Sequence, residues 1–219
     1  MELSLPSDKA QRINAQCKAL HAAQTVTVHA LAKVIGTLSS TVQAILPAPL
    51  YYRHMQLLKT KSLLKQASYA TQIKLDQGSK AELAWWIEHL NKWNGRTLVS
   101  PGPDMIIQTD ASTAGWGAFR EGPTNPQRFN GQWSRTESGL HINLLELRAA
   151  EFAVKALTKD RRDLHIHLKM DNVSALTHIN KMGGCRSRQL IHATKTLWEY
   201  CLDRGILLSA EFLPGIQNT

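Results

Sequence analysis

Three acidic residues of this chain stand in local settings that can bring them together. Asp110 closes an apolar run over 105–110, and Asp171 ends a second, alternating run over 164–171. Glu146 lies near the start of a strongly helical stretch. The three carboxylates converge if the two runs form neighbouring strands and the helix packs across them. Clustered carboxylates repel one another unless a cation holds them, and ligands made only of oxygen favour Mg²⁺ or Mn²⁺. The pattern therefore predicts a divalent metal site.

The helical spacing around Glu146 favours a buried position. Residues on its face of the helix are apolar and mostly small, namely Ala149, Ala150, Ala153, Ala156 and Leu157. A carboxylate at the head of such a stripe is costly unless it is paired or binds a metal. The alternative is an exposed Glu in a first helical turn, favoured there by the helix dipole.

Asp110 and Asp171 each have a local explanation as well. An Asp at a strand end often starts a turn or caps a helix, and a helix is expected from Asn172 onward. The combination of the three acids, in this order along the predicted elements, is much more specific than any one of them.

The elements of residues 101–219 predict an α/β domain. Strands are expected at 105–110, 115–120, 127–133, 164–170 and 206–213, and helices at 142–158, 172–181 and 187–204. The order β-β-β-α-β-α-α-β implies a mixed sheet flanked by helices.

Residues 1–100 form a mainly helical segment, and the boundary is expected near Ser100-Pro101-Gly102-Pro103. Helices are predicted at 26–45, 51–64 and 79–93. Ser79 is the expected N-cap of the last helix, with Glu82 as its capping-box partner. The domain prediction is thus 1–100 and 101–219.

The charge distribution favours a polyanionic partner. Residues 1–100 carry 12 Lys and Arg against 5 Asp and Glu, a net charge of +7, whereas residues 101–219 carry 14 against 12, a net charge of +2. Nucleic acid attracts such a surface, although a merely soluble basic surface is an equal alternative.

No membrane span or signal peptide is evident, and Cys17, Cys185 and Cys201 are expected to be reduced thiols of an intracellular protein, cytoplasmic or nuclear.

Several motifs resemble a known family. They are Thr-Asp-Ala-Ser at 109–112, Gly-Trp-Gly-Ala at 115–118, His-Ile-Asn-Leu-Leu-Glu-Leu-Arg-Ala at 141–149, Met-Asp-Asn at 170–172 and Ile-Asn-Lys-Met-Gly-Gly at 179–184. This set is similar to the RNase H domain of retroelement reverse transcriptases, with the DIRS-type (tyrosine-recombinase) group as the nearest match. The stretch 31–95 resembles the thumb-to-connection region of the same polyproteins.

The resemblance implies an RNase H-like fold, a five-stranded mixed sheet with flanking helices. It also implies Mg²⁺-dependent (or Mn²⁺-dependent) cleavage of the RNA strand of an RNA–DNA hybrid. Two cations about 3.5–4 Å apart activate water and stabilise the leaving oxygen in such chemistry. By this resemblance Asp110 would bridge the two ions, and Glu146 and Asp171 would complete the ion on the leaving-group side.

Neighbouring polar residues are candidates for substrate binding. Ser112, Asn143 and Asn172 could reach 2′-hydroxyls in the minor groove, although each is more often a turn or cap residue. Phosphate contact is the candidate role of two basic residues, Arg186 and Arg188, with a solvated helix start as the equal alternative. Trp116 and Trp133 are expected in the core, and the alternating His165 and His167 are interpreted as a solvated face and not as a metal site.

The chain departs from the family at its end. Family members carry a fourth carboxylate after a His-x-Pro-Gly-x-x-Asn motif, but here Phe212 replaces the His and the sequence stops at Thr219. The chain is therefore expected to be a C-terminally truncated piece of a longer polyprotein, with the polymerase domain as a partner. Two alternatives stay open: an inactive nucleic-acid-binding remnant, and a nuclease or integrase of the same fold acting on DNA.

Overall fold

The computed structural model describes residues 2–97, 102–122 and 126–214, and its contacts divide the chain into two compact units. One unit contains residues 1–100 and 185–188, and the other contains 101–184 and 189–219. The first half of the predicted boundary, Ser100-Pro101, and the end of the predicted terminal motif, 215–219, lie outside the described residues.

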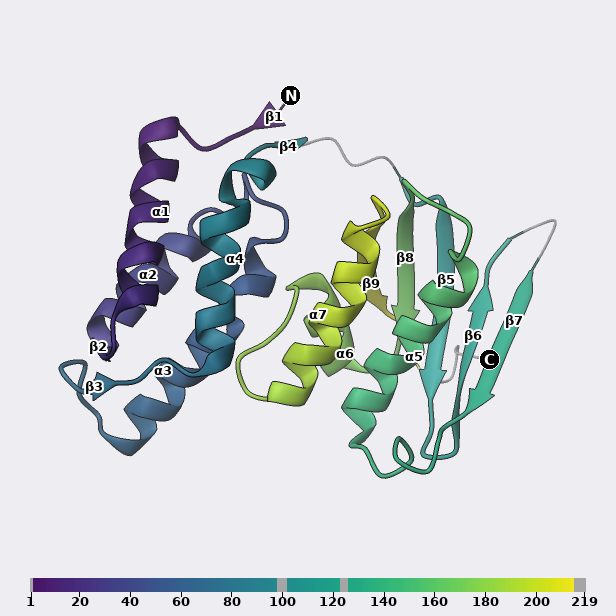
Figure 1. Cartoon of the computed structure of the whole chain (residues 1–219). Coiled ribbons are helices and arrows are strands. Elements are labelled where there is room, and N and C mark those ends of the chain that lie inside the picture. The colour runs from purple at the N-terminus through teal and green to yellow at the C-terminus, as the bar shows by residue number, and fades with distance from the viewer. Residues whose placement is uncertain (1, 98–101, 123–125, 215–219) are drawn as a thin grey trace. The chain divides into compact units, whose positions relative to one another are not determined.

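The second unit is built on a five-stranded sheet (Figure 1). Its strands are β5 (Met105–Ala111), β6 (Gly115–Arg120), β7 (Gln127–Gln132), β8 (His165–Met170) and β9 (Leu207–Phe212). Their spatial order is β7-β6-β5-β8-β9. The first three form an antiparallel meander, and β5, β8 and β9 run parallel. This mixed sheet, with flanking helices and a preceding helical segment, confirms the predicted fold class.

The helices α5 (Ile142–Leu157), α6 (Val173–Asn180) and α7 (Arg188–Leu202) lie on one side of the sheet (Figure 1). Helix α5 contacts β5 and β6, and α6 contacts β9. The predicted small-residue stripe is the contact surface, since Ala149, Ala150 and Ala153 are all 0 % exposed. Small side chains let the helix approach the strands closely, which brings Glu146 down to the sheet.

The opposite face of the sheet carries polar side chains that bond to one another. His165 Nε2 and His167 Nδ1 each lie 2.8 Å from the hydroxyl of Ser209, and Lys169 Nζ donates to Glu121 Oε1 at 2.9 Å. The two histidines therefore belong to a half-buried, hydrogen-bonded surface and not to a simply solvated one.

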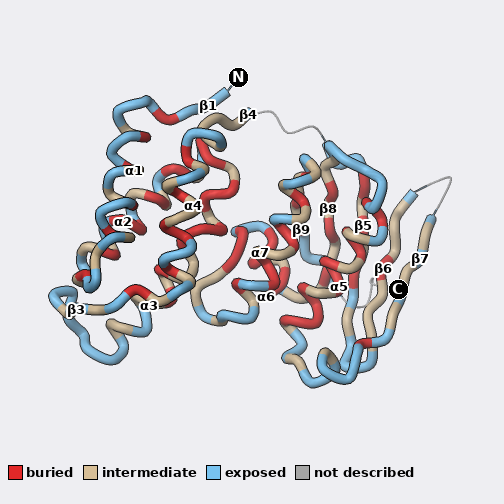
Figure 2. The backbone as a smooth tube through the Cα atoms, viewed as in Figure 1, coloured by how far each residue is buried: buried red, intermediate tan, exposed pale blue. Residues whose placement is uncertain are grey.

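The first unit is mainly helical, as predicted, with a buried core between its helices (Figure 2). Its elements are β1 (Glu2–Leu3), α1 (Ser7–Ala22), β2 (Val26–Thr27), α2 (Val28–Ser39), η1 (Ala48–Tyr51), α3 (Arg53–Lys65), β3 (Gln72–Ile73), α4 (Gln77–Trp93) and β4 (Arg96–Thr97). Among the described residues, no helix is long and apolar enough to cross a membrane.

The predicted bounds of two helices in this unit were wrong. The helix expected over 26–45 begins at Val28, because Val26 pairs with Ile73 in a short ladder, and it ends at Ser39. Beyond that end the Thr41 hydroxyl donates to the Leu38 carbonyl at 2.7 Å, a local bond that competes with helix continuation. Helix α4 is capped by Asp76, which accepts from Ser79 N at 2.9 Å, so Ser79 is not the N-cap.

Glu82 has a different role from the predicted capping box. Its side chain is 2 % exposed and accepts hydrogen bonds from His54 N at 2.7 Å and Met55 N at 3.0 Å. These amides belong to the first turn of α3, whose N–H groups have no partner within the helix. A carboxylate from α4 thus caps α3 and ties the two helices together.

We expect Glu82→Ala to destabilise the protein by about 2–4 kcal/mol, because it leaves two buried N–H groups without an acceptor. Urea denaturation followed by circular dichroism measures the change. The control is Glu88→Ala on the same helix, whose side chain is 68 % exposed. Equal stability of the two variants would contradict the capping role.

Candidate functional site

The parallel pair β5 and β8 brings two acidic residues to one edge of the sheet. Gln108 lies opposite Lys169 in the ladder, so the continuing chains place Asp110 and Asp171 side by side. Asp110 lies in the last two residues of β5, and Asp171 directly follows β8. One oxygen of each of these carboxylates and one of Glu146 all lie within 4.8 Å of one another. The three acids singled out in the sequence therefore converge.

Glu146 lies in the second turn of α5 and reaches this cluster from the side of the sheet that the helix covers. It is 3 % exposed, and its Oε2 atom has no hydrogen-bond partner among the described residues. Asp110 is exposed and Asp171 is of intermediate exposure, so the cluster opens to solvent on their side. A buried, unpartnered carboxylate oxygen that faces two more carboxylates is costly without a cation or a proton.

The electrostatics of the cluster reflect this crowding. Burial, followed by the charges of Asp110 and Asp171, raises the pKa of Glu146 from 4.5 to about 8. Burial and the charge of Asp171 also raise the pKa of Asp110, against the opposing effect of a hydrogen bond from Ala111 N. Near neutral pH, Glu146 therefore holds a proton that a bound cation would displace.

The donor set fits a hard divalent cation. All three groups offer oxygen, they come from three elements, and the unpartnered Glu146 oxygen is a ready ligand. Among the described residues, this is also the single group of at least three His, Cys, Asp or Glu side chains with such spacing.

The turn that follows Asp110 is held in place by a tryptophan. Trp133 Nε1 donates to the Ser112 carbonyl at 2.7 Å, and its ring lies in an apolar cluster with Leu145 and Ala149 of α5. Trp116 packs against the same cluster, as expected for a core residue. This cluster links the turn to the helix that carries Glu146.

Ser112 serves mainly this turn. Its hydroxyl accepts from Ala114 N and Gly115 N, both at 3.2 Å. Ser112 and Asp110 line one hollow, but the hydrogen bonds of the Ser112 hydroxyl are local.

Asn143 and Asn172 are brought together across the two helix starts. Asn172 Nδ2 donates to Asn143 Oδ1 at 3.0 Å, and Asn172 Oδ1 accepts from Ala175 N as the N-cap of α6. The Nδ2 group of Asn143 has no partner among the described residues. It is the donor of this pair that stays available to a ligand.

Arg186 and Arg188 are exposed and are not grouped with the carboxylates. Residues 185–188 cluster with the first unit, whereas the three acids belong to the second. Phosphate contact by these two arginines therefore stays a prediction.

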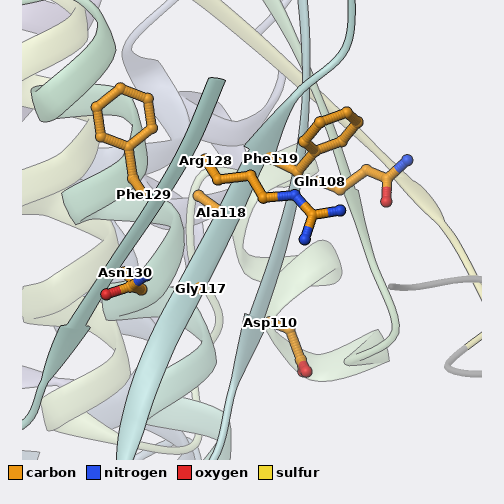
Figure 3. A pocket seen from close by; sticks show the side chains of 8 residues that line it. All are labelled: Gln108, Asp110, Gly117, Ala118, Phe119, Arg128, Phe129 and Asn130. Atoms are coloured by element: carbon orange, nitrogen blue, oxygen red, sulfur yellow. The ribbon is translucent and has the colours of Figure 1, made fainter. Parts of the chain in front are cut away.

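Two adjoining hollows open beside the cluster, on the sheet face opposite the helices. Both include Asp110, Gly117 and Asn130, and the one drawn in Figure 3 also includes Arg128 and Phe119. Arg128 and Asn130 were not predicted from the sequence as site residues. The alternation in 127–132 indicated a strand, but only the pairing of β7 with β6 shows that these two side chains share a face with Asp110.

Comparison with known proteins gives only distant structural likeness. No family model matches the sequence, and no curated protein matches it. RNase H1 from the halophilic archaeon Halobacterium salinarum NRC-1 is 16 % identical with a TM-score of 0.44, over 52 % of this chain and 88 % of that one. LC11-RNase H1 in complex with an RNA/DNA hybrid is 15 % identical with a TM-score of 0.44, over 53 % and 89 %.

A foamy viral protease-reverse transcriptase in complex with an RNA/DNA hybrid is 15 % identical with a TM-score of 0.34. The likeness covers 98 % of this chain and 28 % of the viral one. This chain thus spans about a quarter of the length of that larger protein.

The raised pKa of Glu146 predicts how stability depends on pH in the metal-free protein. Between pH 4.5 and about 8 the folded state binds more protons than the unfolded state. Stability is therefore highest at the acid end and is lost as pH rises, by up to about 1.4 kcal/mol per pH unit. Glu146→Gln should remove most of this loss in urea denaturation series run in EDTA.

The control for this series is Glu199→Gln, a half-exposed carboxylate on α7. It should keep the pH dependence of the wild type. A Glu146→Gln variant that loses stability with rising pH as steeply as the wild type would contradict the electrostatic account of the cluster.

Proposed function

We propose that this chain is a metal-dependent nuclease of the RNase H type that cleaves the RNA strand of RNA–DNA hybrids. The observation that carries the proposal is the convergence of Asp110, Glu146 and Asp171 within 4.8 Å, with one buried Glu146 oxygen unpartnered among the described residues. The motifs around these three acids and the order of the sheet strands support the same reading.

Asp110, Glu146 and Asp171 would hold Mg²⁺ or Mn²⁺. Divalent cations at such a site lower the pKa of water and stabilise the leaving oxygen of a phosphodiester. The chain itself supplies the position of these ligands. Asp110 stands at the exposed side, where a substrate strand arrives, and Glu146 is fixed by the packing of α5. Asn143 Nδ2 is a donor suited to a 2′-hydroxyl, with Asn172 holding the Asn143 side chain in place.

We further propose that the chain derives from a retroelement reverse transcriptase, of the DIRS type, with residues 101–219 as its RNase H domain. Residues 1–100 would be the thumb-to-connection segment, and the polymerase domain of the parent polyprotein would be a partner. The net charge of +7 on residues 1–100 supports a role for this segment in holding the nucleic acid.

A specific observation favours a second candidate function. The positive charge is concentrated in the residues outside the unit that carries the carboxylates, so the chain has the composition of a nucleic-acid-binding protein whether or not it cleaves. An inactive, hybrid-binding remnant of a retroelement polyprotein is therefore the alternative.

The test is cleavage of an RNA–DNA hybrid labelled on the RNA strand. With Mg²⁺ or Mn²⁺ we expect RNA cleavage that EDTA abolishes and that Asp110→Asn lowers at least about 100-fold, since removing a group that acts on the transition state typically costs that much. Asp160→Asn, an exposed acid after α5, is the control and should cleave like the wild type.

Each outcome of this assay selects one candidate. Hybrid binding without cleavage would reject the nuclease in favour of the binding remnant. Cleavage of duplex DNA in place of the hybrid would indicate a DNA nuclease or integrase of the same fold.

Metal binding is measured separately by thermal unfolding. Mg²⁺ or Mn²⁺ should raise the melting temperature of the wild type near pH 8, because the cation binds the folded state and relieves carboxylate repulsion. The shift should be small in Asp110→Asn, whose metal-free form already has less repulsion. An equal shift in both proteins would place the bound cation elsewhere.

A further inference from the structure

The hollows beside Asp110 form one groove across three strands. Asp110, Gly117 and Asn130 make up a row across β5, β6 and β7, and both hollows share this row. The groove extends from the row along β7 in both directions. One end reaches Arg128, as Figure 3 shows, and the other reaches Gln132. A strand that reaches the carboxylates therefore has a continuous depression to lie in.

Glycine keeps this depression open. A Cβ atom at Gly117 would meet no heavy atom within 4 Å, so its absence leaves a gap in the sheet surface where a side chain could stand. The glycine two residues earlier is explained differently, because a Cβ at Gly115 would collide with the carbonyl oxygen of Gly131. Glycine inside a strand costs stability, and it often marks a close approach by a ligand or another backbone. Packing explains Gly115 but not Gly117.

The side chains along the groove suit a phosphodiester strand. Arg128 is exposed, and among the described residues it has no carboxylate partner; its guanidinium lies 5.6 Å from the centre of the Phe119 ring. The ring supports the arginine from one side and leaves its N–H groups available. Asn130 adds an exposed amide between Arg128 and Gln132. The Arg128 guanidinium is planar and always charged, and it lies on the same groove as the amides of Asn130 and Gln132. Such donors suit phosphate and sugar oxygens.

The position of Arg128 fits a strand held at the carboxylates. Neighbouring strands are about 4.8 Å apart, so the backbone of β7 lies about 10 Å from that of β5. Figure 3 shows the Arg128 side chain crossing the hollow from β7 toward β5. The guanidinium charge of Arg128 therefore lies within a few nucleotides of the bond that the carboxylate cluster would cleave.

We infer that this groove binds the RNA strand next to the cleavage point, with Arg128 contacting one of its phosphates and Gly117 forming the floor. The inference rests on the proposed function, because it takes the strand that reaches Asp110 to be the one that is cut. It adds a binding surface on β6 and β7, away from the two helix starts that carry Asn143 and Asn172.

The first test is the salt dependence of hybrid binding by the whole chain, measured in EDTA so that no cleavage occurs. Arg128→Gln should weaken binding about tenfold near 0.1 M salt and reduce the slope of log affinity against log salt by about one, as expected for one lost phosphate contact. The matched control is Arg120→Gln on β6, whose side chain alternates to the other face of the sheet and bonds to Gln127. It should leave affinity and slope unchanged.

A second variant tests the floor of the groove. Gly117→Val places a β-branched side chain in open space, so the melting temperature should hold or rise. Hybrid affinity and cleavage should both fall by on the order of tenfold or more, because the side chain occupies the path of the strand. If Gly117→Val binds and cuts like the wild type, the strand does not lie in this groove.

Single-stranded probes identify which strand is held. Affinity for RNA of the same sequence should depend on Arg128, and affinity for the complementary DNA should not. Dependence on the DNA strand alone would overturn the inference. Equal hybrid affinity and equal salt slope in the wild type and Arg128→Gln would also overturn the inference. If both proteins still cleave the hybrid, the proposed function stays intact. A wild type that neither binds nor cleaves the hybrid would remove both.

Discussion

The structure of the second unit depends on one unfavourable interaction, the placement of three carboxylates within 4.8 Å of one another. Such a cluster does not form by its own attraction, so the surrounding packing has to impose it. The parallel pairing of β5 and β8 fixes Asp110 beside Asp171, and the small residues of α5 let Glu146 reach the same edge. Trp133 then joins the turn after Asp110 to that helix. The apolar contacts of sheet and helix therefore hold in place a charge arrangement that is stable only with a cation or protons.

The sequence predicted this unit well because its signals are local and consistent. The alternation of 105–110 and 164–170, the turns between the first three strands and the stripe below Glu146 each indicate one element, and all eight elements are present near the predicted positions. The convergence of the acids followed from the strand order, which the chain order and handedness rules restrict strongly. Helical propensity alone was less informative in residues 1–100, where a ladder of two residues shortened one predicted helix and α1 was not singled out at all.

The side-chain roles that the sequence did not predict depend on partners far away in the chain. Glu82 has the spacing of a capping box, but its acceptors are used by His54 and Met55, 28 and 27 residues earlier. No local pattern distinguishes these two uses of a glutamate. Likewise, Arg128 and Asn130 look like ordinary polar positions of an edge strand until the register of β7 on β6 places them on the face of Asp110. The sequence likewise could not show that residues 185–188, which include Arg186 and Arg188, cluster with the first unit and not with the residues on either side of them.

The two faces of the sheet contribute different groups to the site. The helix side supplies the buried carboxylate and the packing that immobilises it, and any group placed there is sheltered from water. The other side is open along the row of Asp110, Gly117 and Asn130 and carries the exposed arginine. A polyanionic strand could not approach three ionised carboxylates without compensation, because its phosphates would add to the repulsion. In the proposed complex, a cation held by the cluster and the guanidinium of Arg128 would supply opposite charge at two separate points, so strand binding and neutralisation of the acids would be parts of one electrostatic arrangement.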